Sequence, residues 1–362
     1  MRLILHPGHG KCGSSTIQRF LKRNLKRLHE HRIGVVNQNL EIGIPRRYEW
    51  DTPALFLKEF IIGNQKPNLL KEKLCWLKKN ARKKNYEAVI LSAENLSNER
   101  CYNAQFRIHE AFQNVFEEIL IIYYIRRQDE FLLSAWQQWG MKKGLTFPEY
   151  VEKSMRTNQP NYLQWIQEFE KIYGKEMLKV GLVNHETLFK GDLLSDFTPK
   201  VGLDDGQFEK VSNANVSLHL TYSEVLRRIS GHFKDHLDNQ IKNLLNRKST
   251  YAKHILFSNR KPSVFFKYSK QIMEYYYEIN RRIHAEFFNQ YDFEKLFGKE
   301  KYCSNSREQD SSDEIDEIKE IIAIQNDLIF GLIAKQEKME KHVRDLSQEK
   351  LMIKLRNILG KY

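Results

Sequence analysis

The chain has 362 residues, of which 41% are hydrophobic, and this content predicts a protein that is globular over most of its length. Its formal net charge of +13 indicates anionic partners: a nucleotide, a sulfated or phosphorylated saccharide, nucleic acid or an acidic membrane face. The four cysteines, Cys12, Cys75, Cys101 and Cys303, lack CxxC spacing, which argues against a zinc site and a disulfide framework and favours a reducing compartment.

No stretch of the sequence predicts a membrane crossing. The start "MRLIL" is followed at once by "HPGHGK", which leaves no apolar region long enough for a signal peptide, and no window reaches the roughly 18 apolar residues of a spanning helix. We therefore expect a soluble, cytoplasmic protein, in which any membrane contact is peripheral and at the inner membrane face.

Short apolar runs alternate with longer segments of helical period up to about residue 300, which is typical of an α/β domain. Apolar residues spaced three and four apart predict amphipathic helices at 14–30 and 129–143. Runs rich in β-branched and aromatic residues predict strands buried on both faces, as in a parallel sheet. The clearest such runs are 2–6, 33–37, 87–92, 118–126 and 177–183.

The stretch "LILHPGHGKCGSSTIQRFL", residues 3–21, predicts a strand, a glycine-rich turn and a helix that begins near Ser14. Its glycines allow a tight turn, so that backbone N–H groups point at a phosphate and the helix dipole adds to the attraction. Lys11 supplies a positive charge, and Ser14, Ser15 and Thr16 supply hydroxyls. The stretch therefore predicts a phosphate-binding turn.

The position of the lysine separates this turn from two common nucleotide-binding loops. A Walker A loop has its lysine directly after the last glycine and a hydroxyl residue next, whereas Lys11 lies two residues before Gly13. "GHGKCG" has the GxGxxG spacing of a dinucleotide-binding fold, but no acidic residue closes the second strand, because Glu41 lies beyond "IGVVNQN".

Two later stretches place polar side chains just after predicted strands. "ILSAENLSNE" contains Glu94, which either takes a proton as a general base or belongs to the capping residues of a helix. "IIYYIRRQDEFLLSAWQQ" places Arg126 at the end of a strand and Ser134 eight residues later on a helix. An arginine there can hold two phosphate oxygens in the crevice where open α/β sheets bind ligands, and the serine adds a neutral donor. Arg127 is adjacent and cannot face the same way.

The sequence pattern changes after residue 300. "CSNSREQDSSD" is polar and predicts a linker, so we divide the chain into a domain at 1–300, a linker at 301–313 and a helix at 314–362. A heptad repeat predicts that this helix forms a coiled coil through which the chain self-associates, and a helix folded back on the domain is the alternative. Gln325, Gln336 and Lys350 interrupt its apolar seam. The seam consists of Ile315, Ile322, Ile329 and Val343 at one core position and Ile318, Leu332, Met339, Leu346 and Ile353 at the other.

The order Lys-x-Gly-[Ser/Thr]-[Ser/Thr] in "KCGSSTIQRFL" resembles the 5′-phosphosulfate loop of sulfotransferases, which use 3′-phosphoadenosine 5′-phosphosulfate (PAPS) as donor. The strand-end Arg126 and Ser134 resemble the pair that reaches the donor's 3′-phosphate in this family. "SAENL" resembles the Ser-x-Glu-x-Leu of bacterial carbohydrate-directed members. Weaker similarities at 180–204, where His185 stands in place of a more usual tyrosine, and at 213–229 extend the resemblance over roughly residues 1–300.

The resemblance implies a P-loop-NTPase-like parallel sheet flanked by helices, the sulfotransferase fold, and in-line transfer of a sulfuryl group without a metal. Lys11 would stabilise the charge of the departing 5′-phosphate, and Glu94 would take the proton of the acceptor hydroxyl, with His6, His9 and His185 as rival bases. The residues implied to bind the donor are Lys11, Cys12, Gly13, Ser14, Ser15, Thr16, Arg126 and Ser134.

The motifs favour a carbohydrate acceptor, a polysaccharide or a glycolipid. Trp136 and Trp139 lie beside the expected donor site and either stack on a sugar or belong to the core. Cationic and apolar residues interleave in "KLMIKLRNILGKY", which suits a peripheral membrane contact or a continuation of the coiled coil.

Three other functions remain open from the sequence. A nucleotide or sugar kinase would use the opening turn for ATP. A basic coiled-coil protein would bind nucleic acid, but no nucleic-acid-binding signature is present, and we expect no nucleic-acid partner. The third is a domain with an intact site that serves only as a scaffold.

Overall fold

The computed structural model describes residues 1–42, 50–61, 67–97, 102–211, 220–235, 238–239, 263–299 and 336–347, together with positions 322, 325, 329 and 332. The chain forms two compact units. The first contains residues 1–136, 147–215 and 264–304, and the second contains residues 137–146, 216–263 and 305–362.

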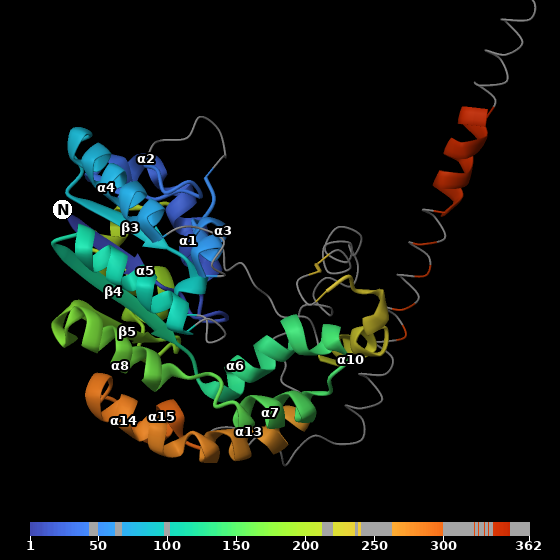
Figure 1. The fold of residues 1–362 in the computed structure, drawn as a ribbon. Helices are drawn as coiled ribbons and strands as arrows, with labels where there is room; N and C mark the ends of the chain where they lie inside the picture. The colour runs from blue at the N-terminus through green and yellow to red at the C-terminus, as the bar shows by residue number, and fades with distance from the viewer. Residues whose placement is uncertain are drawn as a thin grey trace, which may run out of the picture. The chain divides into compact units, whose positions relative to one another are not determined.

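The first unit is built on a five-stranded parallel sheet with the order β2-β3-β1-β4-β5 (Figure 1). Each strand coincides with a predicted apolar run, so the α/β class and the parallel sheet are confirmed. The strands are β1 (Arg2–His6), β2 (Ile33–Val35), β3 (Ala88–Ser92), β4 (Glu118–Ile125) and β5 (Leu178–Leu182).

The position of β3 distinguishes this sheet from a dinucleotide-binding fold. In the dinucleotide-binding order 3-2-1-4-5-6, the first two strands are neighbours. Here β3 lies between β1 and β2. The GxGxxG spacing of the opening turn therefore does not occur in a dinucleotide-binding sheet.

Helices cover both faces of this sheet. The connection from β1 to β2 crosses the sheet in one direction, and the three later connections cross it in the other. Because such crossovers are right-handed, α1 lies on one face and α4, α5 and α8 lie on the opposite face. The helices of the first unit are α1 (Ser14–Arg23), α2 (Leu25–Glu30), α3 (Ala54–Ile61), α4 (Pro67–Lys83), α5 (Tyr102–Val115), α6 (Gln128–Ala135), α7 (Phe147–Arg156), α8 (Tyr162–Tyr173), α9 (Leu193–Lys200), α13 (Ser263–Tyr275), α14 (Tyr277–Phe287) and α15 (Phe293–Phe297).

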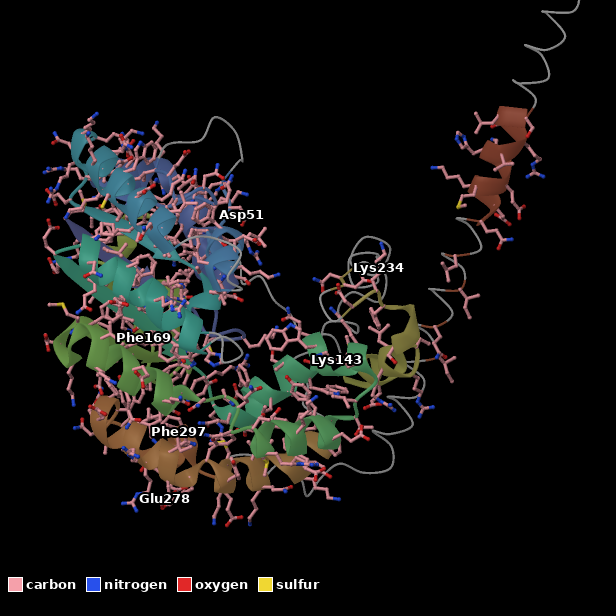
Figure 2. All side chains as sticks on the ribbon, viewed as in Figure 1. Asp51, Lys143, Phe169, Lys234, Glu278 and Phe297 are labelled. Carbon is pink, nitrogen blue, oxygen red and sulfur yellow. The ribbon has the colours of Figure 1, made fainter. Side chains whose placement is uncertain are left out.

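Large aromatic side chains fill the space between the sheet and its helices. Tyr123 and Tyr124 of β4 are fully buried, as is Phe169 of α8. Phe297 of α15, labelled in Figure 2, is buried among the C-terminal helices, where its ring contacts Phe288 and Phe293. The strands read as near-continuous apolar runs because both of their faces are covered.

Two of the predicted helices are interrupted. The segment 14–30 breaks at Asn24, whose side-chain amide donates to Phe20 O (3.0 Å) and Glu209 O (3.1 Å), so that α1 ends there and α2 begins. The segment 129–143 is an α-helix only as far as Ala135; the π turn Trp136–Gly140 and the 3-10 turn Met141–Lys143 follow. An asparagine that hydrogen-bonds to nearby backbone competes with helix continuation.

The second unit contains α10 (Leu220–Arg228), which contacts the turn Met141–Lys143. Arg227 donates to Gly144 O at 3.2 Å across this contact. Residues 336–347 are helical and exposed. The predicted linker 301–313 and residues 212–219 lie outside the described residues, so the division at 300 and the coiled coil stay predictions. In the described part of the chain, no helix has the length and apolar character needed to cross a membrane.

Candidate functional site

Three segments with the predicted site residues meet at the carboxyl edge of the sheet. β1 is central, and its last residue, His6, pairs with Ser92 at the end of β3. On the other side β1 pairs with β4 as far as Leu5 and Ile121, and β4 continues to Ile125. The opening turn, Glu94 and Arg126 therefore follow three adjacent strands at the edge where open α/β sheets bind ligands.

The turn after β1 has an unusual backbone. Gly8, Lys11 and Gly13 have φ values of 52°, 65° and 89°, in the left-handed region that disfavours side chains. A Cβ atom at Gly13 would lie 2.3 Å from Leu193 Cδ2, so this position requires glycine on two grounds. The Cys12 N–H donates to His9 O at 3.2 Å and closes the turn.

Gly13 precedes the first residue of the ten-residue helix α1. That N-terminus has no side-chain cap and no acidic residue in its first turn. The Thr16 N–H donates to Gly13 O at 2.9 Å, whereas the N–H groups of Ser14 and Ser15 belong to the first turn, which an α-helix leaves without an intrahelical partner. The positive end of the helix dipole is thus available for an anion beside Lys11.

Glu94 begins the 3-10 turn Glu94–Ser97 directly after β3 and lies against the opening turn. A Cβ atom at Gly8 would come within 3.4 Å of Glu94 Cγ. Burial raises the pKa of Glu94, and the opposing influences are the charges of Lys11 and His9 and a hydrogen bond with Ser14. The structure thus brings Lys11 and Glu94 together, although they are far apart in the sequence.

Cys12 lies at the centre of this cluster, but its side chain belongs to the core. Its thiol is fully buried, and burial raises its pKa to about 12. The charges of Arg126, Glu94 and Lys11 all act on it. Its Sγ lies 3.7 Å from the Tyr162 hydroxyl. The Cys12 thiol is therefore inert at neutral pH, and all three predicted charged groups lie near enough to influence its pKa.

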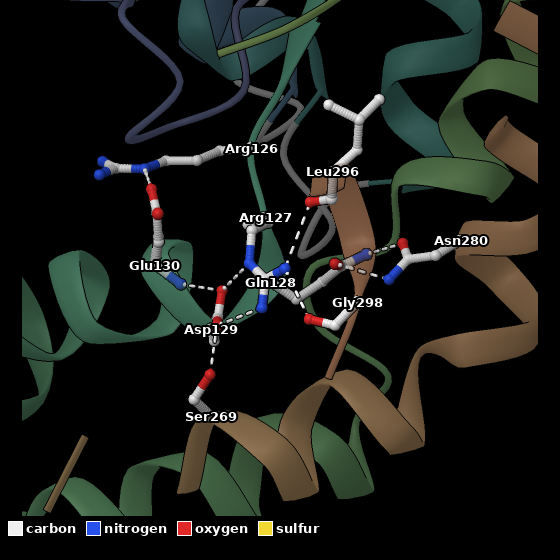
Figure 3. A network of polar contacts seen from close by, with 9 residues as sticks. All are labelled: Arg126, Arg127, Gln128, Asp129, Glu130, Ser269, Asn280, Leu296 and Gly298. Atoms are coloured by element: carbon white, nitrogen blue, oxygen red, sulfur yellow. Dashed lines mark hydrogen bonds and ion pairs between the residues drawn. The ribbon is translucent and has the colours of Figure 1, made fainter. Parts of the chain in front are cut away.

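Arg126 and Arg127 follow β4 and point in different directions (Figure 3). Arg126 is 31% exposed and donates to Glu130 Oε2 at 3.2 Å. Arg127 is 2% exposed and pairs with both oxygens of Asp129, at 3.0 and 2.8 Å. It also donates to the main-chain oxygens of Leu296 and Gly298. The two arginines diverge as the sequence predicts.

Ser134 is half-buried on α6. From the start of α6 at Gln128 to Ser134, six residues of helix rise about 9 Å. Arg126 and Ser134 thus belong to one strand–helix segment. Ser14 and Thr16, by contrast, are buried at 2% and 7% exposure. The Ser14 hydroxyl already donates to His9 O at 3.2 Å, which makes Ser15 the better placed hydroxyl of the three predicted ones.

The rival bases differ in their surroundings. His6 is fully buried, its Nδ1 lies 2.8 Å from Ser92 Oγ, and burial lowers its pKa to about 4. His9 is buried beside Glu94. His185 is exposed in the loop after β5, which β4 separates from β1. Glu94 and His9 are therefore the candidate bases nearest Lys11.

Three features of the site are not predicted from the sequence. Tyr162 of α8 contacts Cys12 and the backbone of Arg126, but nothing in its local sequence marks it. Glu130, four residues after Arg126, is an ion-pair partner that helical spacing could have identified. Trp136 is fully buried against Phe147, so it belongs to the core and offers no face to a sugar.

The described residues include no group of three or more His, Cys, Asp or Glu side chains arranged to hold a metal ion. No protein-family model matches the chain, and a search of curated proteins finds no significant relative.

Proposed function

We propose that the chain is a sulfotransferase that transfers the sulfuryl group of PAPS to a hydroxyl of a carbohydrate. The observation that supports this most is that Lys11, Glu94 and Arg126 follow three adjacent strands, β1, β3 and β4, at one edge of the sheet. Each of the three matches a position of the family's pattern. The central β1 between β3 and β4 is consistent with the proposed P-loop-like sulfotransferase fold.

The hydrogen-bonding groups of the site suit a ligand with two separate phosphates. At one end the first-turn N–H groups of α1, the Ser15 hydroxyl and Lys11 would hold the 5′-phosphate. At the other end Arg126 and Ser134 would hold the 3′-phosphate, and Arg126 would exchange part of its bond with Glu130 for bonds to phosphate oxygens. The N–H groups of Cys12 and Thr16 already donate within the turn, to His9 O and Gly13 O, and the Gly13 N–H would join those of Ser14 and Ser15 around the phosphate.

Glu94 is suited to accept the proton of the acceptor hydroxyl. Its raised pKa makes the carboxylate a stronger base than an exposed glutamate, and Lys11 beside it keeps the ionised form accessible. When bound, PAPS supplies the sulfuryl group that moves to the acceptor oxygen. Lys11 and the helix N-terminus stabilise the negative charge that grows on the 5′-phosphate side of the site.

The carbohydrate nature of the acceptor rests on the "SAENL" resemblance and on the charge of +13. A cationic surface attracts anionic polysaccharides and the headgroups of glycolipids. We propose a cytoplasmic location for the reaction, on the basis of the scattered cysteines.

Calorimetric titration with 3′-phosphoadenosine 5′-phosphate tests the donor site. We expect the wild-type chain to bind it more tightly than ATP with magnesium, and Arg126→Ala to weaken binding by roughly 10- to 100-fold, because a charge-assisted bond to phosphate is lost. Arg2→Ala is the matched control, since Arg2 is an exposed, ion-paired arginine at the opposite edge of the sheet. Preference for ATP with magnesium, or equal effects of the two substitutions, would contradict the proposal.

A further inference from the structure

The C-terminal part of the chain carries a stripe of exposed apolar side chains on helical backbone. Every described residue from 336 to 347 is helical and exposed. A helix gains most of its stability by packing an amphipathic face, so this stripe requires a second surface. The exposed apolar residues on it are Ile322, Ile329, Leu332, Met339, Val343 and Leu346, with exposed fractions between 44% and 60%.

Part of this stripe borders a depression in the surface of the helix. Leu332, Gln336, Met339 and Val343 line this depression, together with Glu340 and Arg344. Their spacing of four, three and four residues is that of the two core positions of a coiled coil. A neighbouring helix with the same repeat would insert its own side chains into this seam.

The residue types at the two core positions favour a coiled coil of two parallel helices. The first core position holds the β-branched Ile322, Ile329 and Val343. The second holds the unbranched or γ-branched Leu332, Met339 and Leu346 in the middle of the repeat, and the β-branched Ile318 and Ile353 near its two ends. β-branched residues at the first position with leucine at the second are typical of two-stranded parallel coiled coils.

The charges beside the seam favour the same arrangement. In a parallel, in-register pair, the residue just before the first core position of one helix faces the residue five positions later on the other helix. In three of these pairs both residues are charged, and in each the charges are opposite: Glu314 with Lys319, Lys335 with Glu340, and Glu349 with Lys354. An antiparallel pair with full overlap would instead place Lys335 beside Lys335 of the second copy.

We propose that residues 315–353 bind a second copy of this chain as a parallel, in-register, two-stranded coiled coil. This inference is independent of the proposed enzymatic activity. Gln336 then faces Gln336 of the second copy, and a polar residue at this core position fixes the register at some cost in stability.

Sedimentation equilibrium of the full chain tests the proposal through its charges. We expect a mass of twice the 43.2 kDa of one chain. Glu340→Lys should raise the dissociation constant of the dimer by roughly tenfold, because two symmetry-related attractive pairs become repulsive. Exchange of both charges, Lys335→Glu with Glu340→Lys, should return the dissociation constant of the dimer to that of the wild type. The control is Glu337→Lys, which makes the same charge change outside the seam and also has a basic residue four positions later.

Disulfide formation tests orientation in a chain whose Cys75, Cys101 and Cys303 are replaced by serine. Leu346→Cys should cross-link to its own copy, whereas Asp345→Cys on the outer face should not. Cross-linking of an Ile322→Cys chain to a Leu346→Cys chain would indicate an antiparallel pair and would overturn the proposal. A monomer would also overturn it, as would a trimer. Thermal unfolding of each variant verifies that the α/β unit is intact.

Discussion

At the scale of single residues, the environment of Glu94 governs the proposed chemistry. The sequence places a glutamate after a strand, but its burial against Gly8 and its neighbours Lys11 and His9 come from the turn after β1. A general base contributes about 100- to 10,000-fold to a rate. Glu94→Gln should therefore lower kcat by about that range and leave the affinity for the donor unchanged. Lys11→Ala should abolish turnover.

The pH dependence of kcat gives a second readout for Glu94. A base acts in its ionised form, so the wild-type rate should fall as the pH drops through the raised pKa of Glu94. This fall should disappear in Glu94→Gln, because the amide that replaces the carboxylate does not titrate. If Glu94→Gln turns over normally, or keeps the same acid limb, His9 is the stronger candidate for the base.

Stability provides a test of Glu94 that needs no acceptor. A carboxyl whose folded-state pKa is raised disfavours the folded state once the pH exceeds its ordinary pKa of about 4.3. Below that pH both states hold the proton and the penalty vanishes. The Tm of Glu94→Gln relative to wild type should therefore increase from about pH 4 to about pH 8. A constant difference in Tm would contradict the raised pKa.

At the scale of elements, a buried ion pair holds the β4–α6 junction that presents Arg126. Arg127 and Asp129 pair with each other, and Asp129 also accepts a bond from Ser269 of α13 at 2.5 Å (Figure 3). Next to them, Gln128 and Asn280 of α14 exchange two hydrogen bonds, at 2.6 and 3.1 Å. The C-terminal helices of the first unit thus fix the strand end that carries Arg126.

Removal of one partner of this pair should be costly. Arg127→Met leaves Asp129 charged and buried, and we expect the free energy of unfolding to fall by about 3–5 kcal/mol in urea denaturation. Arg127→Met combined with Asp129→Leu removes both charges and should recover part of that loss. A double variant less stable than Arg127→Met would contradict this expectation and would show that the bonds of Asp129 to Ser269 and to the Glu130 N–H stabilise the junction without Arg127.

At the scale of the whole molecule, the sequence predicts the strands well because each is a near-continuous apolar run. The order of those strands depends on contacts between distant segments, which no local pattern encodes. The same applies to the pair of Cys12 with Tyr162 and to the bonds of Arg127 with Leu296 and Gly298. Local motifs could identify Lys11, Glu94 and Arg126, but only the fold reveals which of their neighbours are already engaged.

The proposed function requires one donor nucleotide to span the turn after β1 and the end of β4. A crystal structure of the chain with 3′-phosphoadenosine 5′-phosphate would show whether it does. We expect the 5′-phosphate at the N-terminus of α1 beside Lys11, and the 3′-phosphate between Arg126 and Ser134. A nucleotide bound elsewhere, or with its 3′-phosphate away from Arg126, would contradict the proposed function.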